Sequence, residues 1–179
     1  ILGGGMAYTF IKAQGGETGD SICEDDKLGL AIELIQRAKE NKVALYLPTD
    51  VVAADDFCNT ASKKELQIFN ISKGWQGLDI GPESIKIFSK VIINAKTILW
   101  NGPMGVFEMA NFSNGTKAIG EAIKTSTQNG AYSLVGGGDS VSAVKDFGLD
   151  KDVSYVSTGG GAMLESLEGK TLPGIAALK

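Results

Sequence analysis

Two hydrophobic patterns alternate along this chain: short continuous apolar runs, and longer segments with an apolar residue every three or four positions. The first pattern is typical of buried strands and the second of amphipathic helices. In the first part of the chain they predict a short helix from Met6 to Ile11, a break at Gly15–Gly19, an amphipathic helix from Leu28 to about Lys42, and a buried strand from Val43 to Leu47 closed by Pro48.

The middle of the chain shows weaker strand patterns than the rest. A short edge strand is expected at Val51–Ala54 and another strand at Leu66–Ile71, with the polar segment Asp55–Lys64 between them. We interpret this part as a small antiparallel excursion. Glycines follow in the segment Gly74–Pro82, where Gly77 and Leu78 are candidates for one wall of a flat slot that holds a base, and Trp75 has the pattern of a core aromatic.

From Pro82 onward helices and strands alternate regularly. The pattern predicts helices at 82–93, 115–128, 140–147 and 162–167, and strands at 97–100, 131–135 and 153–156. Repeating βα units of this length imply a parallel sheet with helices packed on it. The expected fold is therefore α/β: a doubly wound, mostly parallel sheet with helices on both faces, Rossmann-like with three layers, and the small antiparallel excursion in the middle.

Four glycine clusters, each at the end of an apolar run, mark the candidate site. They are Gly3–Gly5, Asn101–Gly105, Gly136–Asp139 and Gly159–Gly161. Glycine lets the backbone approach a ligand closely, and free N–H groups at a helix start attract phosphate. Each cluster alone also fits an ordinary βα turn. Because ligands bind at the carboxyl ends of parallel strands, we expect all four at one rim, around a nucleotide or phosphorylated metabolite.

Composition narrows the function further. The chain has 179 residues, 43% of them hydrophobic, as expected for one globular domain, and its net charge of −4 disfavours nucleic acid. With no histidine, Ser-His triads and His-ligated zinc are excluded. Cys23 and Cys58 lie far apart, which favours free thiols. No apolar stretch is long enough for a membrane helix and no signal peptide is evident, so we expect a cytoplasmic protein.

Asp139 and Ser140 are the sharpest candidates for chemistry. Both residue types cap helices well, so a plain N-cap is one interpretation. The other is a magnesium site, because Mg²⁺ that bridges phosphates takes only one or two protein carboxylates. Glu108 also has two interpretations, as an acceptor of hydrogen bonds from ribose hydroxyls or as a solvated acid at the surface. The segment Gly169–Thr171 does not complete a Walker A loop, since Leu164 stands where a glycine is required.

Six blocks in this order closely resemble the C-terminal, nucleotide-binding half of phosphoglycerate kinase: GGGMAYTF, GWQGLDIGPES, WNGPMGVFE, VGGGDS, STGGGA and LEGKTLPG. The resemblance covers nearly all of residues 1–179, taken as one domain that is incomplete at its N-terminus. It implies phosphoryl transfer between 1,3-bisphosphoglycerate and ADP, giving 3-phosphoglycerate and ATP, with Mg²⁺ on the nucleotide phosphates. The family also suggests a monomer.

The resemblance assigns roles by position. The adenine would lie among Gly4, Gly5, Tyr8, Gly77, Leu78 and Val106, with Ile22 a less certain neighbour. Pro103 and Glu108 would meet the ribose, Asp139 the magnesium, and Gly137, Gly138 and Ser140 the phosphates. Asn101 would lie near the transferring group, and Thr158, Gly159 and Gly160 near the interdomain cleft.

This sequence also departs from the family pattern. The family's N-terminal half, which carries the basic patch for phosphoglycerate, has no counterpart here, and neither has the opening βα unit with its phosphate-contacting lysines. Ser140 stands where many members have threonine. We therefore predict that this polypeptide alone cannot catalyse the reaction. The open interpretations are a kinase fragment, a nucleotide-binding module without enzyme activity and, third, a purely structural role.

Overall fold

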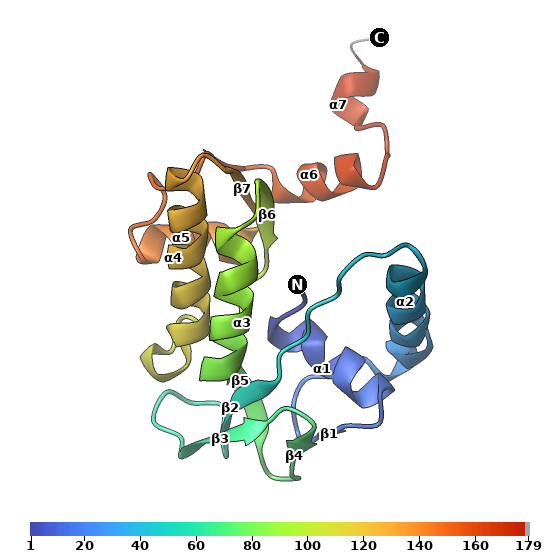
Figure 1. The fold of residues 1–179 in the computed structure, drawn as a ribbon, viewed down its shortest axis with the longest axis vertical. Helices are drawn as coiled ribbons and strands as arrows, with labels where there is room; N and C mark the ends of the chain where they lie inside the picture. Colours follow the sequence, from blue (N-terminus) through green and yellow to red (C-terminus); the bar gives the residue numbers. More distant parts are fainter. Residues whose placement is uncertain (178–179) are drawn as a thin grey trace.

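The computed structural model describes residues 1–177, so the last two positions of the expected domain, 178 and 179, lie outside the described residues. The parallel strands of the C-terminal part form one sheet in the order β6-β7-β8. Their bounds are β6 Thr97–Asn101, β7 Tyr132–Gly136 and β8 Tyr155–Val156. Helices α3 (Pro82–Ile93), α4 (Asn114–Gln128) and α5 (Gly138–Asp146) flank this sheet (Figure 1).

The largest hydrophobic core lies between this sheet and its helices. Phe88 of α3, Ile119 of α4 and Val144 of α5 are almost completely buried in it, together with Val135 of β7. The helix starts follow from local chemistry, since Pro82 occupies the first turn of α3 as expected. At the C-terminal end of α4, Gly130 has a φ of 89°, which ends the helix before β7.

The middle of the chain forms the expected antiparallel sheet. Strand β2 (Asp50–Ala54) lies between β3 (Lys63–Gln67) and β5 (Gln76–Ile80) and pairs antiparallel with both. The segment 51–54 is therefore the central strand of this sheet and not the edge strand that the sequence predicted. A separate two-stranded parallel sheet joins β1 (Glu17–Thr18) to β4 (Asn70–Ile71). The single strand predicted at Leu66–Ile71 is therefore wrong, because a turn at 68–69 divides it between β3 and β4. Two short 3-10 helices, η1 (Asp25–Lys27) and η2 (Ala110–Phe112), lie in loops.

The N-terminal part consists of α1 (Gly4–Ala13) and α2 (Leu28–Glu40), and both helices were expected. Helix α1 begins directly at the glycine cluster and buries Tyr8 and Ile11 in a second core with Val51 and Ile71. In contrast, α2 buries only Ala31.

The predicted strand at Val43–Leu47 is wrong. No ladder forms there, and Val43 is 60% exposed. One backbone hydrogen bond joins this segment to the start of the chain, from the Leu2 N–H to the Tyr46 carbonyl at 2.9 Å. A strand needs hydrogen-bonded neighbours along its length. The apolar run satisfies the sequence pattern, but within residues 1–177 no strand lies beside it.

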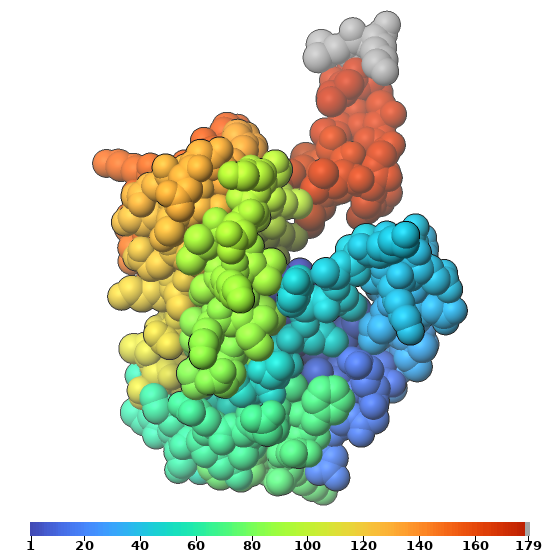
Figure 2. Space-filling model, in the orientation of Figure 1, coloured from blue at the N-terminus to red at the C-terminus, as the bar shows by residue number. Residues whose placement is uncertain are grey.

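The confirmed class is α/β, with parallel sheets flanked by helices and a small antiparallel sheet. Figure 2 shows the surface hollowed between the region of α2 and the C-terminal segment. That segment carries α6 (Gly160–Leu167) and α7 (Pro173–Ala176), neither of which buries a residue. Among residues 1–177 no helix is long and apolar enough to cross a membrane.

Candidate functional site

The four glycine clusters lie in one continuous row. Three of them follow the carboxyl ends of β6, β7 and β8, which run parallel. A Cβ built on Gly137 would collide with Asn101 Oδ1, and one on Gly160 would meet the Gly137 backbone. The first cluster joins the row because a Cβ on Gly4 would lie 2.6 Å from the Pro103 carbonyl oxygen. The turns therefore share one rim, as the sequence predicted.

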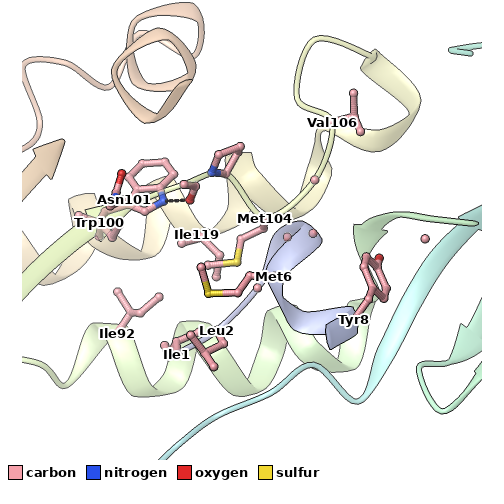
Figure 3. A pocket seen from close by; sticks show the side chains of 18 of the residues that line it. Ile1, Leu2, Met6, Tyr8, Ile92, Trp100, Asn101, Met104, Val106 and Ile119 are labelled. Carbon is pink, nitrogen blue, oxygen red and sulfur yellow. Dashed lines mark hydrogen bonds between the residues drawn. The ribbon is translucent and has the colours of Figure 1, made fainter. Parts of the chain in front are cut away.

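A cavity of about 620 Å³ opens beside this row. Figure 3 shows Met6 and Tyr8 on α1 together with Trp100, Asn101 and Met104, which belong to the end of β6 and the loop after it. The cavity brings together half of the candidate residues, with Ile22 as a further neighbour: Gly4, Gly5, Tyr8, Gly77, Leu78, Asn101, Pro103 and Val106.

The wall proposed for adenine is built from α1, β5 and the loop after β6. Tyr8 is 5% exposed, and its hydroxyl occupies the space that a Cβ on Gly77 would need. The Val106 N–H donates to the Leu78 carbonyl at 2.9 Å, so the loop is fastened to β5. Burial, with a smaller contribution from the charge of Asp79, raises the pKa of Tyr8, which keeps its phenol protonated. The wall formed by these residues is therefore uncharged.

The two candidate ribose residues lie in different surroundings. Pro103 lines the cavity, whereas Glu108 lies outside its lining and is exposed. In the described residues Glu108 is in a turn ahead of η2. Its carboxylate is therefore free to reorient, but the structure alone does not bring it to the cavity.

The phosphate side starts at α5, next to Asn101. Asp139 is exposed in the first turn of α5, and the N-cap position is Gly137, without a side-chain capping bond. The plain N-cap interpretation of Asp139 and Ser140 is therefore wrong. Ser140 is completely buried, and its Oγ accepts a hydrogen bond from the Gly102 N–H at 2.6 Å. Its hydroxyl fastens the β6 loop to α5.

The residues expected at the interdomain cleft follow β8. Thr158 and Gly159 are exposed, and the Gly159 N–H donates to Ser157 Oγ at 3.3 Å. Gly160 packs on the Gly137 backbone, so this turn continues the row beyond α5. The candidates that do not line the cavity are Glu108, Gly137, Gly138, Asp139, Ser140, Thr158, Gly159 and Gly160.

The donor set agrees with a magnesium ion carried by a nucleotide. Across residues 1–177 no group of three or more Asp, Glu, Cys or His side chains could hold a metal by itself. A single exposed carboxylate at a phosphate-binding turn is what Mg²⁺ needs when phosphates and water supply its other ligands. Asp139, an exposed carboxylate in the first turn of α5, fits the protein's part of such a ligand set.

Two buried residues that the sequence analysis missed shape the site. Asp79, on β5, is 2% exposed and accepts a hydrogen bond from the Gly115 N–H at 2.7 Å. Thr116, completely buried on α4, accepts the N–H groups of Met104 and Gly105 through its Oγ, each at 3.1 Å. The available signal was an acid inside the apolar run of residues 77–80.

Comparisons with known proteins agree with this geometry. A family model described as phosphoglycerate kinase matches residues 1–170. The phosphoglycerate kinase of Porphyromonas gingivalis is 60% identical over 179 residues, which are 100% of this chain and 43% of that protein.

Solved structures give the same result. The structure of phosphoglycerate kinase from Coxiella burnetii matches with a TM-score of 0.94 at 45% identity, over 100% of this chain and 46% of that one. The crystal structure of phosphoglycerate kinase from Pyrococcus horikoshii matches with a TM-score of 0.79 at 28% identity, over 98% and 44%. The chain spans less than half the length of these relatives. It belongs to the phosphoglycerate kinase family.

Proposed function

We propose that this chain binds Mg-ADP or Mg-ATP and supplies the nucleotide side of phosphoryl transfer between 1,3-bisphosphoglycerate and ADP. The observation that carries the proposal is the continuous row of the four glycine clusters beside a cavity of about 620 Å³. A cavity of this size is within the usual range for small-molecule sites. Family membership supports the type of reaction.

Each part of the row has a separate task in this proposal. Adenine lies against Tyr8 and Leu78, and the ribose reaches Pro103 and Glu108. The phosphates extend toward the start of α5, where the N–H groups of its first turn and the positive end of the helix dipole receive them. Asp139 holds the magnesium ion, which neutralises charge on the phosphates.

Phosphoryl transfer depends mainly on positioning and charge stabilisation. Asn101 lies at the junction between the adenine cavity and α5, which makes it our candidate for a group near the transferring phosphoryl. Thr158–Gly160 extend the row past α5, toward the side where the second substrate would enter. None of the four glycine clusters contains a lysine or arginine.

For this reason we propose that residues 1–179 alone do not turn over substrate. In this proposal the site for 1,3-bisphosphoglycerate or 3-phosphoglycerate lies in the part of the kinase that this chain does not span; the chain covers 43% of the P. gingivalis relative. A nucleotide-binding unit without activity of its own is the second candidate function. We place the protein in the cytoplasm as a monomer, in line with its family.

Calorimetric titration of the chain with Mg-ADP tests the binding proposal. We expect Asp139→Ala to weaken Mg-ADP binding about tenfold, a loss of about 1.4 kcal/mol. Without magnesium, the wild type and the variant should bind ADP equally. Asp146→Ala is the matched control, because Asp146 is exposed at the opposite end of the same helix. No heat at millimolar Mg-ADP would contradict the proposal.

A coupled assay with 1,3-bisphosphoglycerate and Mg-ADP separates the two candidate functions. Binding without ATP formation identifies a nucleotide-binding unit that needs the rest of the kinase. Turnover at the rate of a full-length relative would refute the expectation that this chain is inactive alone.

A further inference from the structure

We propose that Asp79 is a positioning residue of the nucleotide site, which holds the Pro103–Val106 loop against β5 and α4 without touching the nucleotide. This inference rests on the proposed function. Asp79 does not line the cavity, although Gly77 and Leu78 before it on β5 do. Its side chain lies behind the wall that those residues form.

The carboxylate is fixed by backbone donors. Oδ2 accepts the Gly115 N–H at 2.7 Å, and Oδ1 accepts the Ile80 N–H at 2.9 Å. Gly115 is in the first turn of α4, so Asp79 sets the place where that helix begins. A carboxylate there also interacts favourably with the helix dipole.

The start of α4 in turn holds the loop. Thr116 follows Gly115 directly, and its Oγ1 accepts the N–H groups of Met104 and Gly105, both at 3.1 Å. Asp79 also contacts the loop itself, because a Cβ on Gly105 would lie 2.5 Å from Asp79 Cγ. The loop therefore rests on Asp79 directly and through the start of α4.

The position of this loop determines how far apart the two sides of the adenine site lie. Pro103 faces Gly4 at the start of α1, and the Val106 N–H donates to the Leu78 carbonyl. Both Pro103 and Val106 line the cavity. Release of the loop from Asp79 would move Pro103 and Val106 away from α1 and β5, even where the overall fold persists.

A second buried carboxylate gives a control for simple helix capping. Asp50 is 5% exposed and accepts the N–H groups of Glu83 and Ser84 in the first turn of α3, at 2.9 and 2.7 Å. It has the same kind of partners as Asp79. It does not line the cavity, and the hydrogen bonds of its side chain in the described residues run to Glu83 and Ser84, with none to the Pro103–Val106 loop.

The test compares Asp79→Ala with Asp50→Ala in the 179-residue chain. Both substitutions should lower the urea midpoint, since each removes a buried cap. Only Asp79→Ala should raise the dissociation constant for Mg-ADP, by about tenfold when both proteins are folded. Asp79→Asn, which keeps an oxygen acceptor for the Gly115 N–H, should restore most of the affinity. Equal affinity losses in the two alanine variants would overturn the inference.

Amide hydrogen exchange provides a readout that does not require nucleotide. The N–H groups of Met104, Gly105 and Val106 should exchange faster in Asp79→Ala than in Asp50→Ala or the wild type. Unchanged exchange at these amides would also overturn the inference. If the wild-type chain binds no Mg-ADP, the proposed function fails, and the exchange comparison still decides whether Asp79 holds the loop.

Discussion

Substitution of Asp79 by asparagine should remove a pH dependence of stability that the structure assigns to one carboxyl group. Asp79 is 2% exposed, and burial raises its pKa from 3.8 to about 7, although the Gly115 and Ile80 N–H groups oppose the shift. In the unfolded chain the group loses its proton near its ordinary pKa. Between these two values the folded state holds more protons than the unfolded state.

The sign and size of the effect follow from this difference. Because the folded state binds more protons, the free energy of unfolding decreases as the pH rises, and the decrease ends above the folded pKa of about 7. A shift of roughly three pKa units at about 1.4 kcal/mol each gives about 4 kcal/mol. That is a large share of the roughly 5–15 kcal/mol that stabilises an ordinary domain.

Urea unfolding at about pH 5 and about pH 8 measures this contribution. Wild type should lose about 2.5 kcal/mol more than Asp79→Asn between the two conditions, because the rest of the change of about 4 kcal/mol takes place below about pH 5. The neutral amide keeps an acceptor for the Gly115 N–H but does not titrate. Asp146→Asn, at an exposed position, controls for the change in net charge. Parallel stability curves for wild type and Asp79→Asn would refute the argument that burial holds a proton on this group.

Three further substitutions test the packing around the site. Gly4→Ala should lower the free energy of unfolding by roughly 1–2 kcal/mol, because Gly4 has a φ of 58°. It should also weaken Mg-ADP binding, because the new Cβ would approach the Pro103 carbonyl. Unchanged affinity by calorimetry would contradict this. Phe88→Ala should lower the free energy of unfolding, measured in urea, by about 3–5 kcal/mol, because Phe88 is completely buried. The same substitution at the exposed Phe57 should lower it by less than about 0.5 kcal/mol. Thr116→Val should cost about 1–3 kcal/mol, since two buried N–H groups lose their acceptor, and a neutral result would show that water replaces it.

The rim of the site could be predicted from the sequence because its signals are local. A glycine cluster after an apolar run marks the end of a strand, and parallel strands place such ends together. The contacts of Gly137 with Asn101 and of Gly160 with Gly137 bear this out. Helices α2, α3 and α4 were predicted for the same reason, since their apolar spacing and their end signals agree.

Pairing and cross-loop bonds could not be predicted from local patterns. Val43–Leu47 has the composition of a strand, but it would form one only if another strand were hydrogen-bonded beside it. The Ser140 hydroxyl was assigned to a phosphate through the family resemblance, and local patterns gave no sign that its oxygen accepts the Gly102 N–H, 38 residues earlier. Asp79 was missed because its partner, Gly115, lies 36 residues later along the chain.

The contact between the Trp100 indole and the loop after β6 gives the protein a built-in optical reporter. Trp100 is 4% exposed, lines the cavity, and donates from Nε1 to the Gly102 carbonyl at 2.8 Å. The other tryptophan, Trp75, does not line the cavity, and the Lys64 ammonium lies 3.7 Å from the centre of its ring. Displacement of the loop by a ligand would therefore change the emission of one indole and leave the second as an internal reference.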